Sequence, residues 1–171
     1  MRSTHRTLAL GTLISFCALA QPTGFQDSLL DRMAGKWVLE GTIAGRNTTH
    51  DIVSEWVLGH HYMRIQEVSR DKDAKNKPAY DATIFIGRDP RSGEYRCLWL
   101  DNTGPWDFTS QGIGRAKRVG DTIPFRFGSD DGSSIHTTFS YDRNDDTWQW
   151  SIDNETGGKT RAFARVRLTR K

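Results

Sequence analysis

The residues of this sequence that could carry acid–base or metal chemistry are few and scattered. His60 and His61 are adjacent, and neighbouring side chains of a strand point to opposite faces, so this pair cannot bind one metal ion together. No Cys or His lies nearby at ligand spacing, so we predict exposed turn residues and no metal site. His50 falls in a predicted hairpin region and His136 shares a face with polar residues, so both are expected to be exposed.

A carboxylate pair could be built from Asp101 and Asp107, which flank a loop at a strand end. General acid–base catalysis needs such a group in a dry setting that raises its pKa, whereas Asp beside Asn and Gly is ordinary turn composition. The sequence has no Gly-x-Ser-x-Gly, phosphate-loop or His-Glu-x-x-His motif. We therefore predict no catalytic residue and no cofactor, and keep as an alternative an enzyme that uses Asp101 with His60 or His61.

Aromatic and apolar residues on the expected inner side of the sheet could line a pocket for a small apolar or aromatic ligand. Each of them could instead fill the core, but large barrels retain interior space, which favours a lining role for the set. The predicted lining residues are Trp56, Met63, Ile84, Cys97, Trp99, Phe125, Phe139, Trp148 and Trp150. Trp106 could gate the mouth of such a pocket.

The elements that must position these residues are strands. Apolar residues recur at period two between clusters of Gly, Asp, Asn and Pro, which is typical of an antiparallel sandwich or barrel. An up-and-down meander can bring all the dry faces around one core by closing on itself. We therefore predict an all-β, closed antiparallel barrel of about ten strands, with a two-sheet sandwich as the alternative. The predicted strands are 36–44, 49–58, 61–70, 80–88, 94–101, 108–115, 122–128, 135–141, 147–153 and 160–169.

One short helix is predicted before the first strand. Asp27 is the expected N-cap, Leu29, Leu30 and Met33 form its apolar side, and Gly35 ends it.

The start of the chain predicts export. A basic beginning precedes an apolar run at 8–19 and a small-x-small site, the pattern of a secretory signal peptide cleaved near Ala20-Gln21. The run is too short for a permanent membrane span, and no later segment is longer. We expect a periplasmic or secreted protein with a signal peptide at 1–20, a linker at 21–26 and one domain at 27–171.

Charge and cysteine content narrow the partners. The chain has 24 Lys and Arg against 21 Asp and Glu, and residues 1–20 hold two of the arginines, so the remainder is near neutral. The basic pI therefore gives no support for a nucleic-acid partner, and none is predicted. Beyond the leader only Cys97 remains, so no internal disulfide can form and the fold rests on its core. The oligomeric state is left open.

The segment Gly35-Lys36-Trp37 opens the first strand directly after the short helix. In this it resembles the lipocalin-like (calycin) superfamily, in which the helix plugs one barrel end and the Trp packs near an Arg of the last strand. The resemblance implies that Arg165, Arg167 or Arg170 takes that role here.

A longer ordered set resembles a bacterial lipocalin-like domain family of unknown function. The set comprises Met33–Trp37 with Gly41, Trp56–Gly59 before His61–Met63, Gly87–Asp89, Trp99–Asp101 and Arg170–Lys171. This resemblance implies a fold and a ligand-sized cavity. The chain also resembles nitrobindin-like haem barrels, but the His that binds haem there has no counterpart in the last strand here.

From these observations we predict an exported barrel that binds a small, mainly apolar molecule and performs no chemistry. The alternatives are the Asp101 enzyme described above and a protein-interaction module with a solid core.

Overall fold

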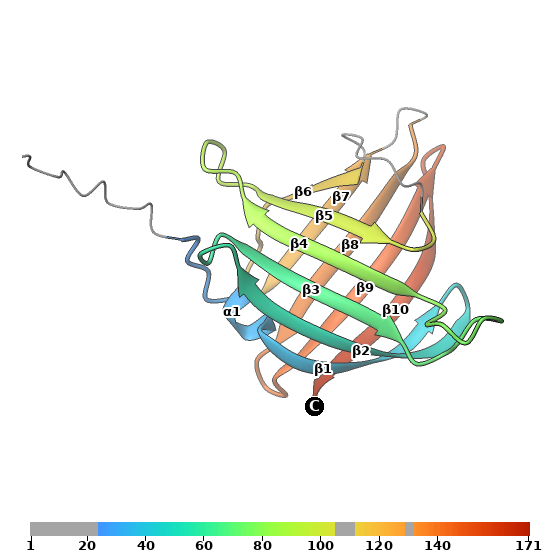
Figure 1. The fold of residues 1–171 in the computed structure, drawn as a ribbon. Helices are drawn as coiled ribbons and strands as arrows, with labels where there is room; N and C mark the ends of the chain where they lie inside the picture. The colour runs from blue at the N-terminus through green and yellow to red at the C-terminus, as the bar shows by residue number, and fades with distance from the viewer. Residues whose placement is uncertain (1–23, 105–111, 129–131) are drawn as a thin grey trace, which may run out of the picture.

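The computed structural model describes residues 24–104, 112–128 and 132–171. These residues form one short helix and ten strands (Figure 1). The elements are α1 (Leu30–Met33), β1 (Gly35–Ile43), β2 (Arg46–Val57), β3 (Tyr62–Ser69), β4 (Asp81–Arg88), β5 (Tyr95–Asp101), β6 (Ile113–Ala116), β7 (Thr122–Gly128), β8 (Ser134–Asp142), β9 (Thr147–Thr156) and β10 (Lys159–Arg170). The strands agree with the predicted ranges to within about three residues, except that part of the sixth predicted strand lies outside the described residues.

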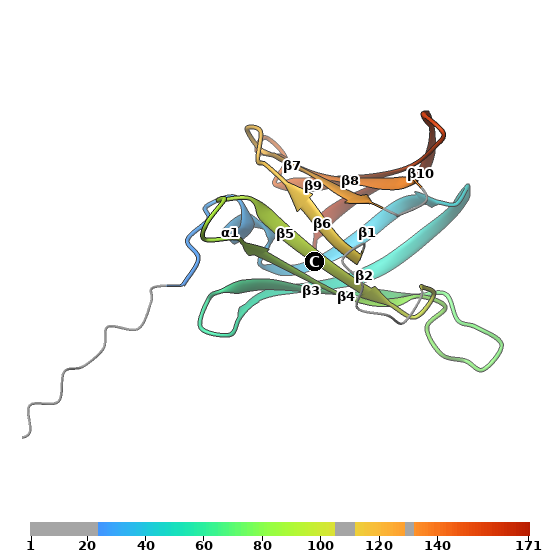
Figure 2. The ribbon, with the colours of Figure 1, turned by 90° about the horizontal axis from the view of Figure 1, so that it is seen from above.

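The strands form a closed antiparallel barrel, as the period-two pattern predicts. Each strand pairs with its neighbours in the chain, and β1 pairs with β10 from Trp37↔Arg170 to Ile43↔Ala164 to close the circle. Closure removes the edges that an open sheet would expose. The view from above shows the strands surrounding a shared interior (Figure 2).

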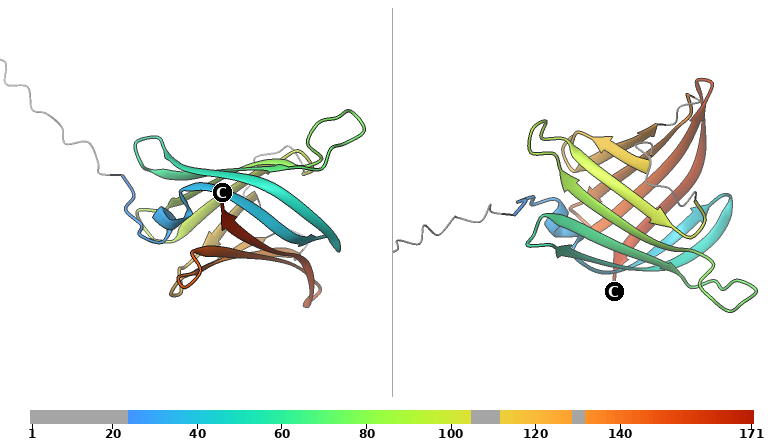
Figure 3. Two further views of the ribbon diagram at one scale, coloured as in Figure 1. Left: turned by 90° about the horizontal axis from the view of Figure 1, so that it is seen from below. Right: turned by 45° about the horizontal axis from the view of Figure 1, so that its top comes forward.

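Successive connections alternate between the two ends of the barrel. We call the end that α1 covers the helix end and the other the distal end; the views of Figures 1 and 3 agree on this placement. The connections at 58–61, 89–94 and 143–146 lie at the helix end, whereas those at 44–45, 70–80 and 157–158 lie at the distal end. In the described ranges, no helix has the length and apolar character needed to cross a membrane.

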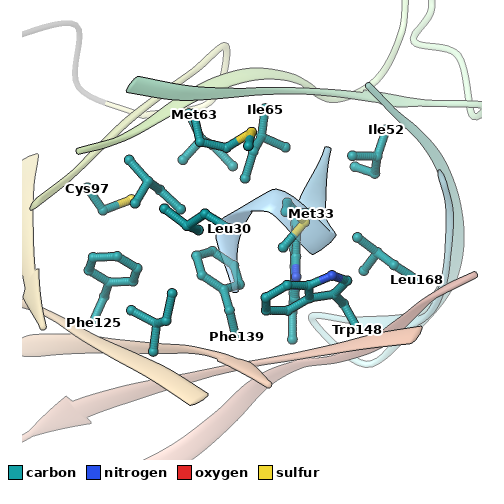
Figure 4. Close-up of a cluster of buried hydrophobic side chains, with 14 of the residues drawn as sticks. Leu30, Met33, Ile52, Met63, Ile65, Cys97, Phe125, Phe139, Trp148 and Leu168 are labelled. Atoms are coloured by element: carbon teal, nitrogen blue, oxygen red, sulfur yellow. The ribbon is translucent and has the colours of Figure 1, made fainter. Parts of the chain in front are cut away.

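The inward face of the strands forms one hydrophobic core that continues onto the helix. Figure 4 shows side chains from opposite walls pointing toward one another, with Leu30 and Met33 of α1 closing the space between them. On β4, for example, Ala82, Ile84 and Ile86 are buried, whereas Thr83 and Phe85 between them are only half-buried. Alternation along each strand therefore decides which residues share the interior.

The helix end is closed by a set of specific contacts. The Asp27 carboxylate caps the turn by accepting hydrogen bonds from the backbone N–H groups of Leu29 and Leu30 at 2.8 and 3.0 Å. The Trp37 indole donates to the Met33 carbonyl at 2.8 Å. The Arg170 guanidinium lies 4.1 Å from the centre of the Trp37 ring.

Arg170 is therefore the last-strand arginine that packs on Trp37. It also donates to the carbonyls of Ala34 and Arg32, both at 3.1 Å. The other two candidates point outward, and each pairs with an aspartate of β9 or of the turn before it: Arg165 with Asp153 and Arg167 with Asp145.

Candidate functional site

The nine residues predicted to line a pocket all belong to the single interior cluster. Seven of them are buried, and Trp56 and Trp99 are partly buried. The aromatic rings meet across the barrel: Trp150 lies 4.7 Å from Phe139 and 6.4 Å from Trp99, measured between ring centres. The structure thus brings the predicted set together, with Trp56 at the helix end and Trp99 toward the distal end.

A polar pair inside the barrel was not predicted as a site. His50 and Glu67 are only 3% and 2% exposed, and His50 Nδ1 lies 2.5 Å from Glu67 Oε1. His50 Nε2 is 2.8 Å from the hydroxyl of Thr48, which is half-buried. Because a carboxylate only accepts, the imidazole donates from Nδ1 to Glu67. Both ring nitrogens of His50 are therefore engaged.

The prediction that His50 is exposed is wrong. Strand β2 begins at Arg46, three residues earlier than predicted, so His50 lies well inside the strand and not in the hairpin. It shares the inward face with Ile52, two residues further on. Glu67 likewise follows the inward Met63 and Ile65 at period two on β3. Extending the alternation by one step would have found both residues.

Three further residues continue this polar group across the distal half of the interior. The His50 ring stacks on Tyr80 with 5.6 Å between ring centres. The Tyr80 hydroxyl accepts a hydrogen bond from Trp99 Nε1 at 2.8 Å and faces Asp101 Oδ2 at 3.4 Å. We call His50, Glu67, Tyr80, Trp99 and Asp101 the distal cluster.

The electrostatics of the distal cluster keep its phenol protonated. Desolvation, followed by the negative charges of Glu67 and Asp101, raises the pKa of Tyr80 far above its ordinary value. At neutral pH the Tyr80 O–H is therefore a donor and not a phenolate. The cluster can hold polar atoms of a bound molecule by hydrogen bonds inside a mainly apolar interior.

The structure does not bring together the residues of the enzyme alternative. His60 lies in the turn between β2 and β3, at the helix end, where it stacks on Trp56 at 4.1 Å and lies 3.8 Å from Asp31. Asp101 ends β5 at the distal end. The proposed pairing of Asp101 with His60 or His61 is therefore wrong, because the barrel separates the two ends.

Asp101 also shows the turn role expected from its composition. Its Oδ1 accepts hydrogen bonds from the backbone N–H groups of Thr103 at 2.7 Å and Gly104 at 2.8 Å. Its predicted partner Asp107, and the predicted gate Trp106, lie outside the described residues.

The other candidate groups have structural partners. His136 is outward on β8, as predicted, and its Nε2 lies 2.7 Å from the Glu155 carboxylate. Burial raises the pKa of the Cys97 thiol, which disfavours the reactive thiolate. In the part of the chain that the structure describes, no three His, Cys, Asp or Glu residues gather in a way that could hold a metal ion.

A second buried polar group lies at the helix end, and it has a structural role. The Tyr95 hydroxyl donates to Asp27, the carboxylate that caps the helical turn, and Arg118 lies 3.4 Å from the same carboxylate. Desolvation and this hydrogen bond raise the pKa of Tyr95 to about 12. Asp27 thus holds a backbone turn in place. In the distal cluster, Asp101 has such a role.

In the described ranges, the buried side-chain atoms without a hydrogen-bond partner include two at inward-facing positions of the strands. They are the Trp150 Nε1 and the hydroxyl oxygen of Ser54. An unsatisfied buried donor or acceptor is costly, so such atoms call for an explanation.

The surface of the barrel wall has two shallow hollows, of about 310 and 460 Å³. The larger is lined in part by Thr48 and Gly41. Thr48 therefore stands between the buried His50–Glu67 pair and a surface that solvent can reach.

Comparison with known proteins adds no assignment, since the sequence matches no protein-family model and no curated protein sequence. The fold and the site define a class of protein: a closed ten-stranded antiparallel barrel with aromatic side chains inside and a polar cluster toward one end.

Proposed function

We propose that this protein is an exported barrel that binds a small, mainly apolar molecule in the distal half of its interior. The observation that carries the proposal is the distal cluster, in which the buried His50–Glu67 pair stacks on the hydrogen-bonded Tyr80, and Trp99 joins it to the aromatic wall of a closed barrel. Aromatic walls with a few convergent polar groups are the usual composition of small-molecule sites. We include in this proposal that the chain is a lipocalin-like barrel, as its sequence resemblance implies.

Stability gives a poor explanation for the buried His50–Glu67 pair. Removing two charged or polar groups from water costs about as much as their mutual attraction returns, and apolar replacements of such pairs are often neutral or stabilising. A barrel that needed only a core would do as well with apolar residues at these positions. The pair is better explained by recognition of a polar atom on the bound molecule.

The arrangement of the ends favours entry from the distal side. At the helix end, Leu30, Met33 and Trp37 are fully buried against the barrel. The distal end has no such plug among the described residues, and the connection between β3 and β4, residues 70–80, lies there. A molecule that reached the distal cluster would not need to displace α1.

Native mass spectrometry of the exported protein tests this proposal, together with calorimetric titration of a panel of neutral, acidic and basic aromatic compounds. A co-purified small molecule, or saturable binding at a one-to-one ratio, supports it. If no compound binds and nothing co-purifies, the proposal is wrong, and the interaction module with a solid core becomes the better account.

Export is tested separately by the intact mass of protein from the periplasmic fraction. Cleavage near Ala20-Gln21 predicts a mass that corresponds to a chain beginning at Gln21. A full-length mass confined to the cytoplasm would contradict this part of the proposal.

A further inference from the structure

We infer that the bound molecule is a neutral aromatic carbonyl compound, such as a ketone or quinone, whose oxygen accepts a hydrogen bond from Trp150 Nε1. The inference rests on the proposed function and adds to it the chemical class of the ligand.

Trp150 differs from the other tryptophans in the described residues. It is 2% exposed, yet its Nε1 has no acceptor. The other four indoles all donate, and their acceptors are Met33 O for Trp37, Asp31 Oδ1 for Trp56, Tyr80 Oη for Trp99 and Arg32 O for Trp148. Since an indole N–H is a donor and never an acceptor, the unpaired N–H of Trp150 calls for an acceptor atom.

The ring of Trp150 lies against one member of the distal cluster. Its ring packs edge to face against Phe139 and Trp99, and Trp99 in turn is hydrogen-bonded to Tyr80. A flat molecule in contact with these rings would gain aromatic packing together with the hydrogen bond. The aromatic surroundings therefore favour an aromatic body over an aliphatic chain.

The charges of the interior argue against an acidic ligand. Glu67 and Asp101 belong to the distal cluster, and no Lys or Arg in the described ranges is buried. Both ring nitrogens of His50 already contact Glu67 and Thr48, so His50 has no free donor for an anion. A carboxylate bound here would be a buried charge beside two acids and without a cation, which is strongly unfavourable.

The inference is tested by calorimetric titration with three naphthalenes of similar shape. The probes are 2-acetonaphthone, which has a neutral acceptor, 2-naphthoate, which is anionic, and naphthalene, which has no acceptor. We expect 2-acetonaphthone to bind most tightly and 2-naphthoate to bind at least tenfold more weakly than the ketone.

The matched variants are Trp150→Phe and Trp148→Phe. Trp150→Phe keeps an aromatic ring but removes the free donor, so we expect about a 2- to 12-fold loss of 2-acetonaphthone affinity and no change for naphthalene. Trp148→Phe removes an indole whose Nε1 already bonds Arg32 O, and should leave the preference for the ketone intact. Circular dichroism of each variant verifies the fold.

The outcomes separate the two proposals. If 2-naphthoate binds as tightly as the ketone, or if Trp150→Phe weakens ketone and naphthalene equally, the inference is wrong while ligand binding stands. If none of the three probes binds and no molecule co-purifies, both the inference and the proposed function are wrong.

Discussion

The buried His50–Glu67 pair allows a quantitative test of how the barrel interior is organised. Replacing His50 by Leu leaves the Glu67 carboxylate, which is 3% exposed, without its 2.5 Å partner. Breaking a buried pair by removing one member costs about 3–5 kcal/mol in other proteins. We take about 3 kcal/mol as the expected loss in the free energy of unfolding. For a chain of this size, that loss lowers Tm by roughly 6–12 °C.

The apolar double variant should behave differently from either single variant. His50→Leu with Glu67→Met removes both polar groups together, so no unpaired charge stays behind. We expect its free energy of unfolding to lie within about 1 kcal/mol of wild type. The two single variants and the double variant then form a cycle that measures the coupling between the residues.

Urea unfolding followed by tryptophan fluorescence and by far-UV circular dichroism supplies the free energies. His136→Leu is the matched control, because it breaks a histidine–carboxylate contact of 2.7 Å on the outer wall, where the His136 side chain is 37% exposed. It should cost less than about 1 kcal/mol. The reasoning fails if His50→Leu costs no more than this control, or if the double variant loses the full sum of the two single variants.

Three other predictions concern the frame of the barrel. Arg170→Ala should lose about 1–2 kcal/mol of stability in thermal unfolding, since the guanidinium holds the helix end to the last strand; a loss below 0.5 kcal/mol, within the range of ordinary surface changes, would contradict this role. Gly41→Ala should lower the free energy of unfolding by more than about 2 kcal/mol, because φ is +147° and an added Cβ would lie 2.3 Å from a backbone oxygen. The control Gly45→Ala, at φ +77° with no atom within 4 Å, should lower it by about 1 kcal/mol. Equal losses in the two variants would refute the steric argument. Hydrogen bonds from Arg70, and secondarily from Lys171, lower the pKa of Asp51 to about 2. The ionised carboxylate therefore stabilises the fold above the unfolded pKa of about 4, and this effect is lost as pH falls toward 2. The difference in unfolding free energy between wild type and Asp51→Asn should shrink between pH 6 and pH 2, and a difference independent of pH would contradict the prediction.

Much of the fold could be predicted from the sequence because the barrel has one dry interior. Every strand must then repeat the same alternation, and errors in strand ends do not change which residues face inward. The same rule decides the arginine that packs on Trp37. Arg170 pairs with Trp37 across the seam and is in phase with the inward Leu168, whereas Arg165 and Arg167 are out of phase and face solvent.

Two residues of the distal cluster have polar side chains at positions that the strand alternation turns inward, so residue type and alternation point in opposite directions. His50 and Glu67 occupy inward positions by alternation, but a His near a hairpin and a Glu between apolar residues suggest solvent when judged by type alone. Tyr80 precedes β4 and Asp101 ends β5. Their meeting with His50 depends on the closure of the barrel, which no local pattern encodes.

The free indole N–H of Trp150 has a consequence for stability as well as for binding. Trp150→Phe and Trp37→Phe delete the same atoms from buried positions that are 2% and 0% exposed. At position 37 a phenyl ring still faces the Arg170 guanidinium, so the packing losses of the two variants should be similar. Trp37→Phe also removes the donor to the Met33 carbonyl, whereas Trp150→Phe removes a donor that has no acceptor. A satisfied hydrogen bond contributes about 1 kcal/mol, and an unsatisfied buried group has a cost of similar size. In urea unfolding of the ligand-free protein, Trp150→Phe should therefore be less destabilising than Trp37→Phe by at least about 1 kcal/mol. Equal losses would mean that the Trp150 N–H is already satisfied in the free protein, and the case for a ligand acceptor at that position would fail.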